Sequence, residues 1–293
     1  SAVTNSAVAR QASADAASIW RFSAKGLGYT MSSQGCNLKP QPLTESTTIG
    51  LSADKAEAGT YFFSEKEPAT YYLSHADYSA YVISAMRTPV VTATNTSSAT
   101  TWYIEPCTSI SLKTNDVGVT TAYYDFAIEI PEGVKAYRVV SVTSEGVVKL
   151  SELNGIIPAG TGFVLKGSPS TSYDVRVLNA DAATPDVNLL RGTYFRNTSM
   201  EKDSFYTLTT ENNDVVMKKP ALATMAANQC YLSAEDVPDV EILKFDFDNI
   251  VDGVQTAVSG QANGAIHTLG GVQVLKTEKG RIYIKNHRAV LIP

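Results

Sequence analysis

The chain of 293 residues carries little charge, and that scarcity excludes two classes of protein. Charged residues make up 18% of the sequence, with a net charge of −5; an average soluble protein has roughly 25%. No basic stripe is present to neutralise phosphates, so we expect no nucleic-acid partner. No apolar run approaches the roughly 18 residues of a membrane-spanning helix, so we expect no transmembrane segment.

Cysteine is also scarce, and its three positions are far apart: Cys36, Cys107 and Cys230. Zinc sites need clustered thiolates or histidines, so this spacing excludes a metal framework, and we expect no cofactor. The odd number allows at most one disulfide, for which Cys36–Cys107 is the conceivable pair. We favour the alternative that all three are buried, small apolar side chains.

The composition indicates a folded, exported protein. Hydrophobic residues make up 44% of the chain, enough to build cores, and the length favours two or three modules. The chain begins with Ser, and its first twenty residues lack a basic start followed by an apolar core. We therefore interpret it as a mature protein whose export signal has been removed. Its composition, which is rich in Ser and Thr and poor in charge, is typical of proteins on a bacterial outer surface.

The residue pattern predicts an all-β fold. Short runs alternate in polarity or are rich in β-branched and aromatic residues, and turn residues interrupt them roughly every eight to twelve positions. No window of helical length keeps an apolar stripe with a 3.6-residue period. The clearest predicted strands lie in residues 127–130, 137–142, 162–165, 173–177, 242–247, 281–284 and 289–292.

Changes in composition divide the chain into three predicted domains. Residues 1–118 are rich in Ser, Thr, Ala and Tyr, whereas residues 119–250 contain regular strands and acidic turns. Residues 251–293 begin with a Gly-, Gln- and Ser-containing linker and end in a compact β segment. We expect a β-trefoil-like barrel, a β-sandwich-like module and a short C-terminal β segment, in that order.

The barrel prediction depends on internal sequence similarity within the first domain. The segments around Trp20 and Trp102 are similar and lie 82 positions apart, and residues 59–63 show a related pattern near the middle of that interval. A strand-rich repeat of about forty residues that occurs three times is typical of a β-trefoil, in which each unit buries its face against the others.

Three stretches of the first domain carry a resemblance to known proteins: residues 15–22, 28–31 and 99–106. They resemble the ricin-type or β-trefoil-like modules attached to secreted proteins of the Bacteroidetes. A β-sandwich-like module of the same surface proteins is similar to three later stretches: residues 126–137, 155–167 and 188–192. The resemblance implies a secreted or surface module and implies no reaction.

The C-terminal residues give the most specific resemblance. Residues 266–274 and 279–292 are similar to the closing β-hairpin of many exported proteins of that phylum. His267 stands where a tyrosine is commoner, and His287 replaces the hairpin glycine. These departures leave the predicted hairpin intact and weaken the export or anchoring role that the resemblance implies.

The three histidines do not indicate catalysis. His267 and His287 fall in the predicted terminal hairpin, where we interpret them as surface residues of strands. His75 lies between Ser74 and Asp77, but side chains this close on an extended chain diverge and cannot form a Ser–His–Asp triad. We therefore expect a protein that is not an enzyme.

Two further segments are interpreted as structural. Residues 246–253 contain several aspartates, but the glycine comes too late for a calcium loop and the closing glutamate is missing. We expect a strand with outward aspartates that runs into a turn. Residues 155–167 are rich in glycine, but a strand follows them instead of the helix N-terminus of a phosphate site, so they predict a tight turn.

Tyrosine provides the candidate binding site. Fifteen tyrosines accompany only two tryptophans, and Tyr72, His75, Asp77 and Tyr78 combine aromatic rings with polar groups at a predicted turn. Sugar sites use an exposed ring for the apolar face of the sugar and polar groups for its hydroxyls. The alternative is that alternate tyrosines pack the barrel. The Gln-x-Trp signature of ricin-type sites is missing, so we interpret both tryptophans as core residues.

Together these observations predict a non-catalytic extracellular binding module at the outer surface. We expect a monomer that binds a glycan or a cell-surface polysaccharide and contributes to adhesion. Two alternatives remain open: a structural or assembly subunit of a surface appendage, and an accessory C-terminal region of a larger secreted hydrolase.

Overall fold

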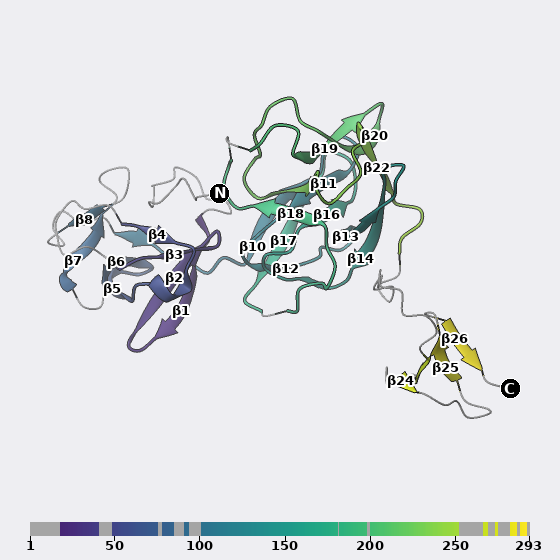
Figure 1. Ribbon diagram of the computed structural model, residues 1–293. Coiled ribbons are helices and arrows are strands. Elements are labelled where there is room, and N and C mark those ends of the chain that lie inside the picture. Colours follow the sequence, from purple (N-terminus) through teal and green to yellow (C-terminus); the bar gives the residue numbers. More distant parts are fainter. Residues whose placement is uncertain are drawn as a thin grey trace.

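The computed structural model describes residues 18–40, 49–75, 78–84, 91–93, 101–180, 182–197 and 200–251, together with four short strands between residues 266 and 291. Within these ranges the chain forms β-strands and no α-helix (Figure 1). A 3-10 turn, Lys55–Glu57, begins after Asp54, whose side chain accepts a hydrogen bond from the Ala56 N–H. The all-β fold is confirmed. No described helix is long and apolar enough to cross a membrane.

The strands of the first sheet occupy residues 21–103. In chain order they are β1 Arg21–Lys25, β2 Gly28–Ser33, β3 Cys36–Leu38, β4 Leu51–Ser52, β5 Tyr61–Glu67, β6 Thr70–His75, β7 Tyr78–Ser84, β8 Val91–Ala93 and β9 Trp102–Tyr103. The main path runs β4-β3-β2-β5-β6-β7-β8, with β1 on β2 and β9 on β6. Most neighbours in this path are also neighbours in sequence, as short hairpin connections require.

A small hydrophobic core packs on one face of the first sheet. Its buried members are Met31, Leu38, Ile49, Tyr61 and Leu73. Trp20 and Trp102 pack against this cluster, which confirms their predicted role as core residues. Because side chains on a strand alternate between faces, the inward Tyr61 and Leu73 leave their neighbours in β5 and β6 facing outward. The threefold repeat of this domain stays a prediction.

The central strands form two sheets. In chain order they are β10 Ser109–Lys113, β11 Val119–Ala122, β12 Ala127–Glu129, β13 Lys135–Val142, β14 Val147–Leu153, β15 Ile156–Ile157, β16 Phe163–Lys166, β17 Ser172–Leu178, β18 Leu190–Thr193, β19 Phe205–Glu211, β20 Asp214–Lys218, β21 Gln229–Ser233 and β22 Ile242–Asp246. The smaller sheet runs β10-β17-β12-β15, and the larger runs β11-β16-β13-β14-β22-β20-β19-β21-β18. Since β10 pairs with β17, the smaller sheet begins before residue 118; the predicted domain boundaries stay a prediction.

Strands β11, β16 and β13 form a wall shared by two hydrophobic cores. Phe163 and Leu165 of β16 face a core beneath the smaller sheet, whereas Val164 between them faces a second core inside the larger sheet. A strand that is buried on both faces needs a continuous apolar run, and residues 163–165 provide one. The core beneath the smaller sheet lies between two packed sheets, and this part of the module is sandwich-like.

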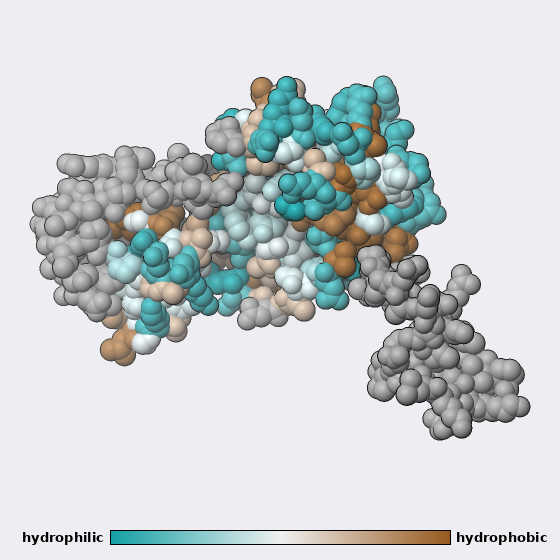
Figure 2. Space-filling view, in the orientation of Figure 1, coloured by the Kyte–Doolittle hydropathy of each residue, from teal (hydrophilic) through white to brown (hydrophobic). Residues whose placement is uncertain are grey.

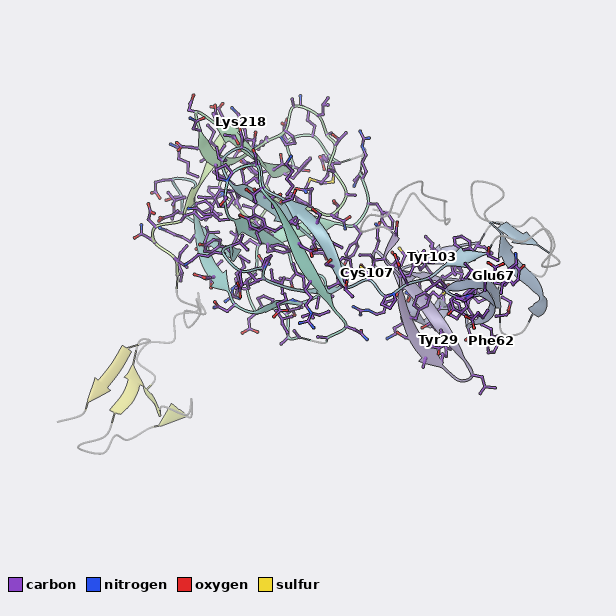
Figure 3. All side chains as sticks on the ribbon, turned by 180° about the vertical axis from the view of Figure 1, so that it is seen from behind. Tyr29, Phe62, Glu67, Tyr103, Cys107 and Lys218 are labelled. Carbon is purple, nitrogen blue, oxygen red and sulfur yellow. The ribbon has the colours of Figure 1, made fainter. Side chains whose placement is uncertain are left out.

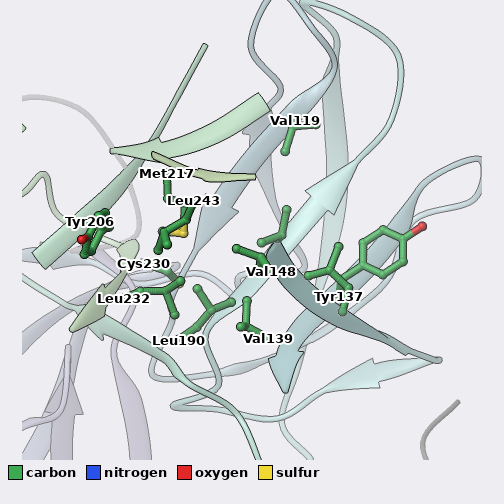
Figure 4. Close-up of a cluster of buried hydrophobic side chains, with 12 residues drawn as sticks. Val119, Tyr137, Val139, Val148, Leu190, Tyr206, Met217, Cys230, Leu232 and Leu243 are labelled. Carbon is green, nitrogen blue, oxygen red and sulfur yellow. The ribbon is translucent and has the colours of Figure 1, made fainter. Parts of the chain in front are cut away.

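The larger sheet curls back on itself, so that β11 at one end contacts β21, the strand next to the other end. The Thr121 hydroxyl of β11 donates to Gln229 Oε1 at 2.8 Å, and the Cys230 N–H of β21 donates to Thr121 Oγ1 at 3.3 Å. The enclosed core contains Leu150, Met217, Leu232 and Leu243, each fully buried (Figure 4). The central module is therefore a near-barrel with a small sheet packed on one wall.

The C-terminal strands form a separate four-stranded sheet, drawn in yellow in Figure 1. They are β23 Ile266–Thr268, β24 Gln273–Val274, β25 Ile282–Lys285 and β26 Arg288–Leu291. β25 and β26 pair antiparallel from Ile282↔Leu291 to Lys285↔Arg288, which confirms the predicted hairpin. His267 lies in β23, and His287 lies outside the described residues.

The cysteines differ from the prediction at one position. Cys36 and Cys230 are buried, as expected, but Cys107 is exposed, and none of the three forms a disulfide. Cys107 lies in the segment between β9 and β10, where the chain passes from the first sheet to the central module. A connecting segment has no core to enter, so its small apolar side chain stays at the surface.

Candidate ligand-binding face

The predicted site residues fall on one hairpin. Tyr72 and His75 lie in β6, Tyr78 begins β7, and the backbones of His75 and Tyr78 pair directly. Asp77 and the side chains of His75 and Tyr78 lie outside the described part of the chain. The turn predicted for this segment therefore lies between β6 and β7. Of the four predicted site residues, the structure describes the side chain of Tyr72 only.

Tyr72 points away from the core. Its neighbours Tyr71 and Leu73 both contact the core of the first sheet, so alternation places Tyr72 on the opposite face. The Tyr72 side chain is half-buried and is not among the residues packed on that core. The alternative interpretation, that tyrosines pack the barrel, holds for Tyr61 and Tyr71 but not for Tyr72.

A second tyrosine, missed by the sequence interpretation, lies beside Tyr72 on the same face. Tyr103 of β9 is the backbone partner of Thr70, two residues before Tyr72 along β6. Diagonal neighbours of this kind lie within reach of aromatic side chains. Tyr103 is 67% exposed, and Figure 3 shows it near Glu67 at the end of the β5–β6 hairpin.

Charged groups flank the two rings. Lys66 Nζ lies 5.9 Å from the centroid of the Tyr72 ring, a cation–π geometry. A side-chain hydrogen bond to Glu105, together with the negative charge of that residue, raises the pKa of the Tyr103 hydroxyl above its usual value. We call the set Lys66, Tyr72, Tyr103 and Glu105 the outer face.

The outer face lies on paired strands, which fix its geometry. Ser64 of β5 pairs with Tyr72, and Phe62 lies diagonally beside it with its ring half-buried. Gly28 of β2 allows the strands to approach closely, because an added Cβ would lie 2.6 Å from the Tyr61 carbonyl oxygen. The Tyr72 ring is therefore supported by three continuous strands, β2, β5 and β6, and the Tyr103 ring lies on β9, which pairs with β6.

The local sequence already indicated that the Tyr103 side chain faces outward. Residues 98–104 were part of the internal similarity to residues 16–22, and an inward Trp102 requires an outward Tyr103 on the same strand. What the sequence did not contain was the pairing of β9 with β6, which brings together two residues 31 positions apart. The side chain that completes the face was therefore not found from the local pattern around Tyr72.

The structure describes residues 246–251 and 155–167 of the two segments interpreted as structural, whereas Asp252 and Gly253 lie outside the described residues. Asp246 ends β22, and its carboxylate binds Lys149 Nζ and the side-chain amide of Asn249. Gly155 and Gly160 have positive φ values of 71° and 70°, and β16 follows them. No group of three or more metal-ligating side chains occurs among the described residues.

No protein-family model, curated protein or solved structure matches this chain. The resemblance to secreted Bacteroidetes modules, including its ricin-type element, stays a prediction.

Proposed function

We propose that the protein is a non-catalytic extracellular module that binds carbohydrate on the outer face of its first sheet. The observation that carries the proposal is the placement of Tyr72 and Tyr103 as outward-facing neighbours on paired strands. Aromatic rings of this kind present an apolar surface to the C–H groups of a sugar, while their hydroxyls remain available to polar partners. The resemblance to secreted surface modules supports the same location and a role in adhesion.

The charges around the rings favour a neutral glycan. Lys66 is the single cation of the outer face, and Glu105 on the same face and Glu67 at the adjacent hairpin end provide two carboxylates. A strongly anionic polysaccharide would meet these carboxylates and be repelled. A neutral sugar ring would instead stack on tyrosine and exchange hydrogen bonds with Lys66 and Glu105.

The proposal is tested on a glycan array with the full chain, followed by titration of the best neutral glycan. We expect Tyr72→Ala and Tyr103→Ala each to weaken binding about tenfold or more, equivalent to a loss of roughly 1.4 kcal/mol. Tyr29→Ala is the matched control. Tyr29 is also an exposed tyrosine, but its ring packs edge-on against Phe63 at 5.6 Å, on the core face of the sheet.

His75→Ala, Asp77→Ala and Tyr78→Ala extend the test to the other predicted site residues. Loss of binding in these variants would enlarge the site to the β6–β7 hairpin, whereas unchanged binding would confine it to the outer face. Binding that survives both Tyr72→Ala and Tyr103→Ala would contradict the proposed site. An array without any bound glycan would contradict the proposed function, and sedimentation would then test the alternative of a self-associating structural subunit.

A further inference from the structure

The turn that joins β14 to β15 contains the pair Asn154–Gly155. Both residues are exposed, and Gly155 has a φ of +71°, a backbone conformation that glycine adopts without steric cost. A Cβ added to Gly155 would meet no atom within 4 Å. The fold therefore leaves open space beside the backbone of this residue.

The side-chain amide of Asn154 and the backbone N–H of Gly155 are not held by hydrogen bonds. The Gly155 carbonyl accepts from the Ile130 N–H at 2.9 Å, whereas the Asn154 amide and the Gly155 N–H form no hydrogen bond within the described residues. Other asparagines use this amide to tie segments together: Nδ2 of Asn188 and Nδ2 of Asn228 donate to backbone carbonyls at 2.7 and 3.0 Å. The Asn154 side chain is therefore free to turn toward the backbone nitrogen that follows it.

This pair permits a reaction within the chain. Glycine has no Cβ beside its nitrogen, so that nitrogen approaches the side-chain carbonyl carbon of the preceding residue with the least hindrance. The Gly155 nitrogen forms a bond to Asn154 Cγ, the Cγ–Nδ2 bond breaks, and ammonia leaves with the proton of the Gly155 N–H. Water then opens the five-membered succinimide at either carbonyl, which gives aspartate or isoaspartate. Nothing is oxidised or reduced, and water is the only reactant from outside the chain.

We infer that Asn154 is a site of spontaneous deamidation and isomerisation in the folded protein. Three observations carry the inference: glycine at the next position, the exposure of both residues, and the lack of hydrogen bonds that would hold the two reacting groups apart. The site is independent of the outer face and of any glycan. The modification replaces a neutral amide with a negative charge.

The modified residue lies next to the edge of the smaller sheet. β15 is the outermost strand of that sheet, and Ile157, which is 1% exposed, fixes it in the core. An isoaspartate adds one carbon to the backbone between β14 and this anchor. The Gly155 carbonyl then moves out of register with the Ile130 N–H, and their hydrogen bond is lost. We expect the isoaspartate form to be less stable than the asparagine form.

The inference is tested by ageing the full chain in mildly alkaline buffer at body temperature and digesting samples with trypsin. The tryptic peptide Leu150–Lys166 contains Asn154 and no other asparagine or glutamine, so its gain in mass reports deamidation at this residue alone. A protein-isoaspartate methyltransferase then labels isoaspartate in that peptide. We expect the amide to be lost progressively and isoaspartate to appear with it. The other Asn–Gly pair, Asn263–Gly264, lies outside the described residues and in a different tryptic peptide.

Asn179 is the matched control. Its side chain is also exposed and forms no hydrogen bond within the described residues, but Ala180 follows it. Because the alanine Cβ hinders attack by the backbone nitrogen, we expect Asn154 to lose its amide about tenfold faster than Asn179, or more.

Two variants separate the chemistry from the fold. Gly155→Ala places a Cβ beside the attacking nitrogen and should slow the reaction about tenfold or more. Asn154→Gln keeps a side-chain amide, but attack on it would form a six-membered ring, so its Leu150–Lys166 peptide should stay unchanged. Aged wild type should melt at a lower temperature than fresh wild type, whereas aged and fresh Asn154→Gln should melt at the same temperature.

Four outcomes would overturn the inference. They are a Leu150–Lys166 peptide that keeps its amide in the native protein while the same free peptide loses it, equal rates at Asn154 and Asn179, a wild-type rate in Gly155→Ala, and conversion to aspartate without isoaspartate. The first would show that the fold protects the turn, and the last would show direct hydrolysis of the amide without a succinimide.

Discussion

The carboxylate of Asp125 accepts a hydrogen bond from the backbone N–H of Gly35 at 3.2 Å, and so joins the central module to the first sheet. Arg21 adds to the joint by donating from Nη2 to the Asp125 carbonyl at 3.3 Å. Gly35 has a φ of +71°, and a Cβ at this position would lie 2.6 Å from the ring of Tyr194. The turn between β2 and β3 therefore requires glycine both for its backbone conformation and for its close approach to the central module.

This joint predicts a pH dependence of stability. Burial raises the pKa of Asp125 above its usual value of 3.8, against the opposing effects of the Gly35 and Gln34 N–H groups and of Arg21. A carboxyl with a raised native pKa stabilises the fold when protonated, and that contribution is lost as pH rises through the native pKa. Asp125→Asn does not titrate.

The melting temperature of Asp125→Asn minus that of wild type should therefore increase as pH rises above about 4 and level off once Asp125 is ionised. Differential scanning fluorimetry over a pH series measures this difference. A difference that stays constant across the series would show that Asp125 ionises in the fold as it does in the unfolded chain.

The thiols should react at very different rates. Burial raises the pKa of Cys230 to about 12, and its Sγ donates to the Ala122 carbonyl at 2.9 Å. The thiolate is the reactive form, so at pH 8 only about one Cys230 in ten thousand would be ionised even if a reagent could reach it. Cys36 is also buried, and Cys107 is exposed.

A colorimetric thiol titration of the native protein should therefore detect one fast-reacting group, and three after denaturation. Cys107→Ser should abolish the fast reaction. Absence of any fast thiol in the wild type, with recovery after reduction, would indicate instead the Cys36–Cys107 disulfide.

Gly192 should tolerate no side chain. An added Cβ would overlap the ring of Tyr123, which packs directly on the β18 backbone and lies 4.7 Å from the Tyr194 ring. Gly192→Ala should lower the free energy of unfolding by about 1–3 kcal/mol, the usual cost of overpacking. Gly50→Ala is the matched control, since its nearest neighbour would be the flexible Lys39 side chain at 3.4 Å. Urea denaturation measures both, and equal stabilities would contradict the proposed packing.

Ser151 offers a stabilising substitution. It is 1% exposed in β14, and its Oγ has no hydrogen-bond partner in the described structure. Replacing it with alanine removes an unsatisfied hydroxyl and should raise the free energy of unfolding by about 1 kcal/mol. The same urea measurement checks this. A loss of stability in Ser151→Ala would show that the hydroxyl has a partner that contributes to the fold.

The surface of the described residues also exposes apolar side chains outside the proposed binding face. Figure 2 shows apolar side chains gathered on one side of the central module and at the tip of the β1–β2 hairpin, where Leu27 is 94% exposed. The partly buried residues around the barrel core include Phe245 and Phe247, whose rings stack at 5.5 Å, and Lys166 lies over the Phe247 ring. Single exposed apolar residues are normal at a protein surface and need no ligand to explain them.

The strand pattern of the sequence was sufficient to predict the fold class and several local features. Alternation and β-branched runs predicted strands such as β13 and β22, and the terminal hairpin followed from two runs separated by a turn. The two tryptophans were correctly interpreted as core because no lectin signature surrounded them. These features depend on neighbours within a few residues, where chain geometry leaves few alternatives.

The shared wall and the outer face depend on contacts between residues distant in sequence. Val164 and Leu165 carry the same kind of side chain, yet they enter different cores, because the smaller sheet covers one face of β16 and the curled larger sheet encloses the other. Tyr103 joins Tyr72 only because β9 pairs with β6. The loops that precede β16 and β18 are joined by the hydrogen bond from Asn188 to the Gly162 carbonyl, across 26 positions of the sequence. The sequence by itself determined which residues form strands and which side of each strand is apolar. Tertiary structure alone decided which strands pair, because pairing is selected by the burial of complete faces, a property of the whole chain and of no single segment.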